Sequence, residues 1–187
     1  MARQQLIALI RKLSYREGKF TLSSGKESSF YVDIKNVSLH PRGAKLVGQM
    51  AWQELKKSGV DLAAIAGVGG PTLGADPLAT ALSLGALDFG VEVPAFIIRK
   101  EPKKHGTSQW IEGRENLKSG GNLVVVEDVV TTGGSSLKAI EKIRAEGFVF
   151  SHLVAVLDRN EGGREALQKA GVTLVALTSI DQIQASS

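Results

Sequence analysis

The sequence contains no cysteine, and this absence excludes several classes of protein at once. Without thiols there is no disulfide scaffold, no thiolate-bound zinc or iron–sulfur cluster and no cysteine nucleophile. Aromatic residues make up only 5% of the chain, which is few for a surface that stacks on exposed bases. No segment approaches the roughly 20 apolar residues that a membrane span requires. The 187 residues suffice for one compact domain with its own core, so we expect a single domain.

The charge balance is mildly positive and narrows the range of partners. The chain has 23 Lys+Arg against 19 Asp+Glu, a formal net charge of +4. This excess is small for a nucleic-acid-binding protein and suits a small phosphorylated substrate equally well. The segment Met1–Ser14 has neither the long apolar run nor the small-residue cleavage site of a secretion signal. We therefore expect a cytoplasmic protein that binds neither nucleic acid nor a membrane.

The first 60 residues predict two helices and one strand. Apolar residues recur at helical spacing over Gln4–Tyr15. A Gly/Ser-rich turn at Leu22–Ser29 leads into a strand at Phe30–Ile34. Pro41 then stands where the first turn of a helix tolerates it, before a second apolar stripe.

From Leu62 onward, short apolar runs alternate with helical patterns. Strands are expected at Leu62–Val68, Val93–Ile98, Asn122–Val126, Phe148–Leu157 and Val172–Leu177, with helices at about Gly74–Leu84, Ser135–Ala145 and Glu165–Ala170. Continuous apolar strands separated by helices predict an α/β fold with a mostly parallel sheet covered on both faces. Ligands bind such sheets at the carboxyl ends of the strands, so the segments after these strands are the candidate site.

The run Leu123–Ser136 carries the most specific pattern. Its apolar strand is expected to end in Glu127 and Asp128, and a loop rich in glycine and hydroxyl groups then opens a helix. Glycine lets the backbone approach an anion closely, and the positive end of the helix favours a phosphate there. The adjacent carboxylates can accept hydrogen bonds from two vicinal hydroxyl groups. A phosphate site beside such carboxylates indicates a ribose phosphate as the ligand. The alternative is an acidic pair that frays into a capped helix.

A cationic segment follows the strand that ends at Ile98. Five of the seven residues in 99–105 are basic, and Pro102, Gly106 and Gly113 predict an exposed loop. Such a run is often only a solvated face. At the ligand-bearing end of the sheet it could instead neutralise a diphosphate leaving group and exclude water.

The run around Glu127 and Asp128 resembles the phosphoribosyl-diphosphate signature of the type I phosphoribosyltransferases. The resemblance implies a small N-terminal hood over about residues 1–40, beside a mostly parallel sheet. It also implies that the acids meet the ribose hydroxyls and that the loop holds the 5-phosphate. The residues so implicated in binding phosphoribosyl diphosphate (PRPP) are Lys26, Arg99, Lys100, Lys103, His105, Glu127, Asp128, Val129, Val130, Thr131, Thr132, Gly133, Gly134 and Ser135.

Within that family the chain resembles the orotate phosphoribosyltransferases over roughly residues 20 to 162. The run Arg99–Gly113 looks like their catalytic loop, and Lys103, His105 and Asp128 are the implied catalytic residues. Lys26 matches the lysine of the hood, while Thr131 and Arg159 match the positions that contact orotate.

This narrower resemblance also implies the reaction and its partners. The expected activity is transfer of phosphoribosyl from PRPP to N1 of orotate in pyrimidine biosynthesis. Mg²⁺ is the expected cofactor, held mainly through PRPP and water with no direct protein ligand. A homodimer with shared active sites is also implied: Lys100 serves its own subunit, whereas Arg99, Lys103 and His105 reach the partner's site.

One position departs from the family, and other readings remain open. Leu73 stands where some relatives carry a lysine, so backbone N–H groups of Gly69–Thr72 would have to hold the diphosphate. A planar guanidinium at Arg159 suits the carboxylate of orotate, but an ion pair with Glu161 or Glu165 would also explain it. A purine phosphoribosyltransferase, or a non-catalytic regulator that binds PRPP and nucleic acid, is an alternative function.

Overall fold

The computed structural model describes residues 1–21, 25, 27–102 and 110–185. Along the chain the regular elements are α1 (Ala2–Leu13), β1 (Tyr15–Thr21), β2 (Glu27–Val32), α2 (Lys35–Ser38), α3 (Pro41–Lys57), β3 (Ile65–Pro71), α4 (Asp76–Ala86), β4 (Ala95–Ile98), β5 (Ile111–Glu112), β6 (Asn122–Val130), α5 (Gly134–Ala145), β7 (Val149–Asp158), α6 (Gly163–Lys169), β8 (Thr173–Ser179) and α7 (Ile180–Gln184). Among the described residues, no helix is both long and apolar enough to cross a bilayer.

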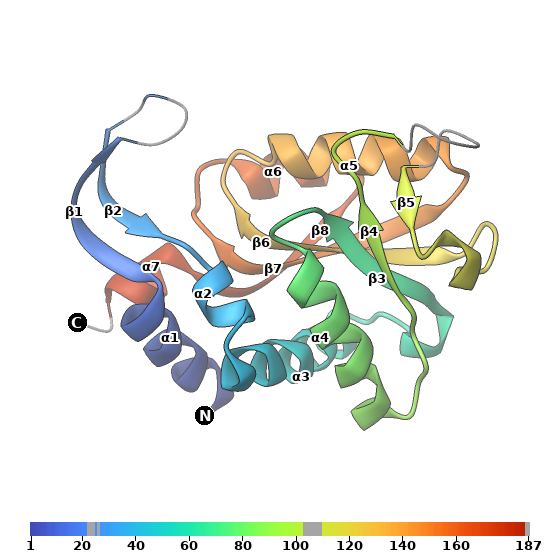
Figure 1. Cartoon of the computed structure of the whole chain (residues 1–187), viewed down its shortest axis with the longest axis horizontal. Helices are drawn as coiled ribbons and strands as arrows, with labels where there is room; N and C mark the ends of the chain where they lie inside the picture. Colours follow the sequence, from blue (N-terminus) through green and yellow to red (C-terminus); the bar gives the residue numbers. More distant parts are fainter. Residues whose placement is uncertain (22–24, 26, 103–109, 186–187) are drawn as a thin grey trace.

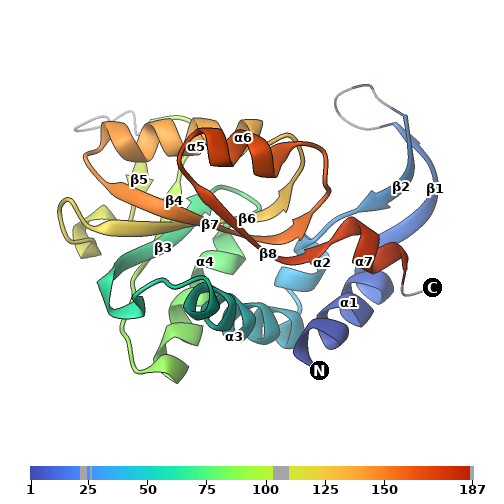
Figure 2. The ribbon, with the colours of Figure 1, turned by 180° about the vertical axis from the view of Figure 1, so that it is seen from behind.

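The main sheet has six strands in the order β5-β4-β3-β6-β7-β8. All neighbouring strands are parallel except β5, which runs antiparallel to β4. Helices α5 and α6 cover one face, and α1, α3 and α4 lie on the other (Figures 1 and 2). The predicted α/β fold, with its mostly parallel sheet buried on both faces, is confirmed.

The core forms on both faces because successive side chains of a strand point to opposite sides. On β6, Leu123 and Val125 join the cluster under α5, with Ile140 and Ile143. Val124 and Val126 join the other cluster, which α3 and α4 cover. A strand of this sheet is therefore buried on both of its faces, which explains the continuous apolar runs in the sequence.

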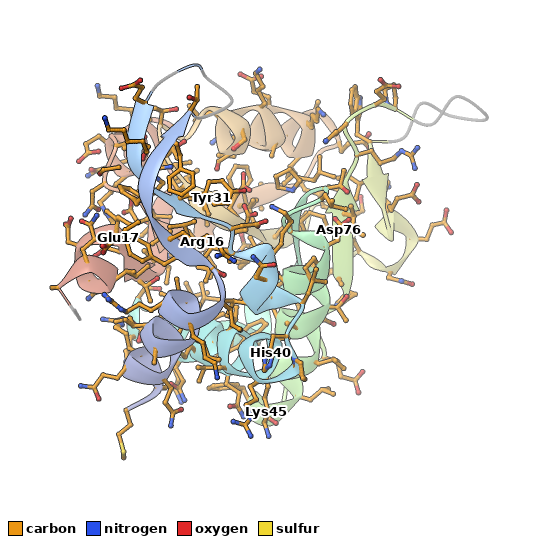
Figure 3. The ribbon with its side chains drawn as sticks, turned by 60° about the vertical axis from the view of Figure 1, so that its left-hand side comes forward. Arg16, Glu17, Tyr31, His40, Lys45 and Asp76 are labelled. Atoms are coloured by element: carbon orange, nitrogen blue, oxygen red, sulfur yellow. The ribbon has the colours of Figure 1, made fainter. Side chains whose placement is uncertain are left out.

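The chain before the main sheet folds differently from the sequence-based expectation. The predicted strand Phe30–Ile34 lies earlier, at Glu27–Val32, because Asp33 leaves the strand and its Oδ1 accepts the Lys35 N–H at 3.1 Å. Its partner β1 was not predicted, since the sequence YREGKFT has no apolar alternation. The two strands form a separate antiparallel sheet that stands beside the main one (Figure 1), with Arg16 opposite Tyr31 (Figure 3).

Candidate active site

Four parallel strands end at one edge of the main sheet, and their following residues form the candidate site. Backbone hydrogen bonds tie these segments together: Thr72 N–H donates to the Ile98 carbonyl at 3.0 Å, and Arg159 N–H donates to the Val130 carbonyl at 2.9 Å. The segments after β3, β4, β6 and β7 are thereby fixed side by side, as expected at the carboxyl edge of a parallel sheet. The residues that follow the four strands are Thr72, Arg99, Thr131 and Arg159.

A turn at residues 131–133 joins β6 to α5 and forms the candidate phosphate site. Gly133 has a φ of +81°, which the left-handed turn into the helix requires, and α5 begins at Gly134. The first N–H groups of a helix have no partner inside it and carry its positive end. Thr132, Gly134 and Ser135 are exposed, so an anion can reach this turn.

Glu127 lies almost fully buried beside this turn. Its Oε1 accepts the hydroxyl groups of Ser135 and Ser136, each at 3.1 Å, so the carboxyl group holds the first turn of α5. Burial, with the nearby Asp128 carboxylate, raises the pKa of Glu127 to about 7. The two serine hydrogen bonds act in the opposite direction and favour the charged form. Glu127 thus supports the phosphate turn as well as lying next to it.

Asp128 is the more accessible carboxylate of the pair. Its Oδ1 accepts the Val129 N–H at 2.8 Å, and its Oδ2 lies 3.9 Å from Lys35 Nζ. Lys35 also pairs with Asp33 at 2.8 Å, and these carboxylates raise the pKa of Lys35. A Cβ added at Gly74 would lie 2.5 Å from Asp128 Oδ2, so only glycine leaves this carboxylate its place.

The acidic pair does not end the strand as predicted. β6 continues through Glu127 and Asp128 to Val130, because Val129 and Val130 pair with Leu157 and Asp158 of β7. The alternative of an acidic pair that frays into a helix is wrong for the same reason. Val129 is half-buried, and Val130 is buried with its carbonyl taken by Arg159.

The basic segment leaves the sheet through a hydrogen-bonded neck. Arg99 N–H donates to the Trp110 carbonyl at 2.9 Å, and the Arg99 guanidinium pairs with Glu112 of β5. Lys142 of α5 donates to the Arg99 carbonyl at 3.0 Å, and its Nζ lies 3.9 Å from the centroid of the Trp110 ring. Lys100 follows as an exposed residue. The predicted site residues Lys103 and His105, and Lys26 of the hood, lie outside the described residues.

A hollow of about 520 Å³ opens between the ends of β3 and β4, next to the neck. Thr72 lines it, and its hydroxyl donates to Oδ2 of Asp76 at 2.8 Å. Asp76 lies at the start of α4 (Figure 3). The expectation that backbone N–H groups of residues 69–72 are free for a diphosphate is wrong for two of them. Pro71 has no N–H, and that of Thr72 is donated to Ile98. Leu73 is exposed and brings no charge in place of the lysine.

Arg159 forms one of the two ion pairs that its sequence position left open. Its Nη2 pairs with Glu161 at 2.8 Å, and no pair between Arg159 and Glu165 occurs in the described chain. Its guanidinium also lies 4.8 Å from the centroid of the Phe30 ring, on β2. The side chain is only 12% exposed, so the hood strand and the sheet hold it in place. The ion pair and a position at the site edge are thus compatible.

Sequence reasoning missed several residues that shape this site. Three of them reach the site only through tertiary contacts. Lys35 and Gly74 lie against Asp128, and Lys142 contacts the neck. Nothing in the local pattern distinguishes Lys142 from Lys138, one turn earlier on the same helix. Glu161 was named only as one possible partner of Arg159. Its distance of two residues from that arginine was the available signal.

A divalent cation would find few protein ligands here. Within the described ranges, no group of three or more His, Cys, Asp or Glu side chains is gathered to hold a metal. Glu127 is buried and engaged by two serines, which leaves the partly exposed Asp128 as the carboxylate at the phosphate turn. This donor set fits a hydrated Mg²⁺ that is bound mainly through substrate oxygens.

Comparisons with known proteins agree with this geometry. Residues 33–181 match the family model described as a phosphoribosyl transferase domain. The orotate phosphoribosyltransferase of Nostoc sp. is 44% identical over 182 residues, covering 97% of this chain and 85% of that protein. A crystal structure of the Mycobacterium tuberculosis orotate phosphoribosyltransferase with Fe(III) dicitrate superposes with a TM-score of 0.82 at 35% identity, covering 98% of this chain and 99% of the other.

A second structure of the M. tuberculosis enzyme contains 5-phospho-α-D-ribosyl 1-diphosphate. It superposes with a TM-score of 0.80 at 32% identity and covers 98% of this chain and 99% of the other. These likenesses extend over nearly the full length of both chains, so they include the hood, the sheet and all four strand ends. The chain therefore belongs to the orotate phosphoribosyltransferases, pentosyltransferases of pyrimidine biosynthesis within the phosphoribosyltransferase family.

Proposed function

We propose that this chain transfers the 5-phosphoribosyl group of PRPP to N1 of orotate, giving orotidine 5′-monophosphate and diphosphate. The observation that carries the proposal is one sheet edge that joins an exposed turn at the N-terminus of α5 to a carboxylate pair and a largely buried arginine side chain. Thr131, Thr132, Gly133, Gly134 and Ser135 provide the N–H and hydroxyl groups for the 5-phosphate. Val129 and Val130 lead the chain into this turn.

In this proposal the two acids bind the ribose of PRPP, and the arginine binds orotate. Asp128 is exposed enough to accept ribose hydroxyl groups, with Glu127 behind it. Arg159 suits the carboxylate of orotate because a planar guanidinium binds a carboxylate through two parallel hydrogen bonds. Thr131 follows β6, the strand next to β7 and Arg159, and contacts both phosphate and base in this assignment.

The reaction breaks the C1–O bond to diphosphate and forms the bond from C1 to N1, with no covalent enzyme intermediate. N1 gives up its proton and bonds to C1, while diphosphate leaves with the C1–O bonding pair and takes up a proton. Positive charge develops on the ribose in between, and carboxylates beside it stabilise that charge. Asp128 takes this part. The basic side chains that receive the leaving diphosphate are Arg99, Lys100, Lys103 and His105, with Lys26 from the hood.

Mg²⁺ completes the proposed site. When bound, it neutralises charge on the diphosphate and so makes it a better leaving group. The protein's part is to place Asp128 and the phosphate turn around the same substrate, and the described residues gather no cluster of three or more metal-binding side chains.

The proposed assembly is a homodimer in the cytoplasm, with small-molecule substrates and no nucleic-acid partner. In it, Lys100 acts within its own subunit, while Arg99, Lys103 and His105 reach the site of the other. Arg99 is part-exposed and paired with Glu112 at the surface of the subunit, from which a side chain can exchange partners. The β1–β2 sheet serves as the hood over the base.

The test is consumption of orotate with PRPP, with and without Mg²⁺, while adenine, hypoxanthine and uracil are supplied in parallel. We expect turnover of orotate alone, and only with the metal. Turnover of a purine with none of orotate would refute the assignment of Arg159. No turnover of any base, combined with salt-sensitive binding of RNA or DNA, would replace the enzyme by a PRPP-binding regulator.

A further inference from the structure

Arg159 has one conspicuous unmet hydrogen bond. Its Nε is buried, and no acceptor for it is found in the parts of the chain that the structure describes. Its Nη2 is already bound by Glu161 at 2.8 Å. A carboxylate that binds a guanidinium through two parallel bonds uses two neighbouring N–H groups, such as those at Nε and Nη2. Of these two N–H groups of Arg159, Glu161 binds only the one at Nη2, and the one at Nε has no acceptor.

The two partners of this ion pair differ in exposure. Arg159 is 12% exposed and is fixed over the Phe30 ring, whereas the Glu161 side chain is 41% exposed. Exposed carboxylates gain little from such a pair and readily exchange it for water or another ion. Any exchange at this pair thus moves Glu161 and leaves the arginine in place.

The turn that carries Glu161 is firmly anchored. Asn160 has a left-handed φ of +54°, its N–H donates to Asp158 Oδ1 at 2.9 Å, and its side-chain amide donates to Asp181 at 2.6 Å. Asp158 itself is buried and paired with Arg164 at 3.0 Å. Asp158 is thereby committed elsewhere, and Glu161 is the carboxylate presented to Arg159.

We propose that Glu161 is an internal competitor: its carboxylate occupies the Arg159 guanidinium until the carboxylate of the pyrimidine substrate displaces it. The inference rests on the proposed function. A substrate carboxylate that binds Nε and Nη2 together satisfies the orphaned N–H and so outcompetes the single bond from Glu161. A pyrimidine without a carboxylate cannot displace it and meets a neutralised arginine. Glu161 would therefore lower the affinity for acidic pyrimidines, which must displace it, and leave the affinity for neutral pyrimidines unchanged.

The test compares Glu161→Gln and Glu161→Ala with the wild-type protein, using orotate and uracil. Removal of the competitor is expected to lower KM for orotate by roughly two- to five-fold, the range of a weak exposed ion pair. Inhibition by uracil and KM for PRPP are expected to stay unchanged. Glu165→Gln is the matched control, because it removes the same charge from an exposed position on α6 without a recorded pair to Arg159.

Each result separates the competitor from other roles. An unchanged or raised KM for orotate in both Glu161 variants would overturn the proposal, since a raised value would mean that Glu161 aligns Arg159. An equal fall for orotate, uracil and PRPP, or an equal fall in Glu165→Gln, would also overturn it as a general charge effect. If the wild-type protein turns over no orotate, the proposed function fails first. Calorimetric titration with orotate then tests the competition directly, and absence of binding to every variant overturns both.

Discussion

Glu127 shows how a single buried carboxyl group can link the phosphate turn to pH. The group is 4% exposed, and its pKa is raised from 4.5 to about 7 by burial and by Asp128. Between these two values the folded chain keeps a proton that the unfolded chain has released. Stability therefore falls as pH rises through this window, and the full cost of the buried charge is present above about pH 7.

Glu127→Gln removes this cost while an amide oxygen can still accept from Ser135 or Ser136. The shift from 4.5 to about 7 corresponds to about 3 kcal/mol. We expect the free energy of unfolding of the variant, relative to wild type, to rise by a value of that order between pH 5 and pH 8. Urea denaturation at both pH values measures it. Glu165→Gln, at an exposed position, should show a constant difference, and so would Glu127→Gln if its carboxyl group titrated normally.

Gly74 gives a second prediction at the scale of one residue. A methyl group at this position would lie 2.5 Å from Asp128 Oδ2, so Gly74→Ala must push that carboxylate out of place. If Asp128 binds the ribose, KM for PRPP should rise by up to about ten-fold, the value of one lost hydrogen bond. Steady-state kinetics measure it, and KM for orotate serves as the internal control. An unchanged KM for PRPP would remove Asp128 from the ribose site.

At the scale of elements, α5 does more than begin at the phosphate turn. Lys142, on the same helix, contacts both sides of the neck: the Arg99 carbonyl at 3.0 Å and the Trp110 ring at 3.9 Å. Burial and the nearby Lys138 lower the pKa of Lys142, so the helix holds a partly desolvated ammonium against the neck. The two contacts mean that a shift of α5 would be felt at Arg99.

Lys142→Met should therefore loosen the neck without touching the phosphate turn. Loss of one hydrogen bond and one cation–π contact predicts a rise in KM for PRPP of roughly three- to ten-fold. A change in the fluorescence of Trp110 should accompany it, and Lys142→Arg should restore part of both. Lys138→Met, at an exposed position one turn away, is the control. Wild-type kinetics in Lys142→Met would show that the neck needs no support from α5.

Strands could be predicted from the sequence where burial requires apolar residues. They could not be predicted where a strand forms only through hydrogen bonds to its neighbour. The runs predicted for β3, β6, β7 and β8 are largely apolar because helices cover both faces of the sheet (Figure 2). β1 has no apolar run to predict it, since it forms through hydrogen bonds to β2 and leaves most of its surface to water, and β5 is only two residues long. The extension of β6 through Glu127 and Asp128 depends on β7 in the same way.

For the molecule as a whole, the site could be predicted only as far as it is local in sequence. The phosphate turn has a recognisable order of strand, acids, glycine and hydroxyl groups, and the structure forms it at the expected sheet edge. The contacts of Lys35 with Asp128 and of Lys142 with the neck join residues about 90 and 40 positions apart, respectively. No periodicity encodes such pairs, because they depend on how the layers are stacked.

The proposed sharing of sites between two subunits yields a prediction that belongs to the assembled molecule. If Lys103 serves the partner's site and Arg159 its own, a dimer of one Lys103→Ala and one Arg159→Ala chain holds one intact site. Random exchange makes half of the dimers mixed, so mixing the two inactive variants should restore roughly a quarter of wild-type activity. Lys100→Ala mixed with Arg159→Ala should restore none, because both residues act in their own subunit and each site then carries one defect. Activity assays after denaturation and joint refolding measure both mixtures. If neither mixture regains activity, every site is built from one chain. If only the mixture of Lys103→Ala with Arg159→Ala regains activity, the basic loop crosses the dimer.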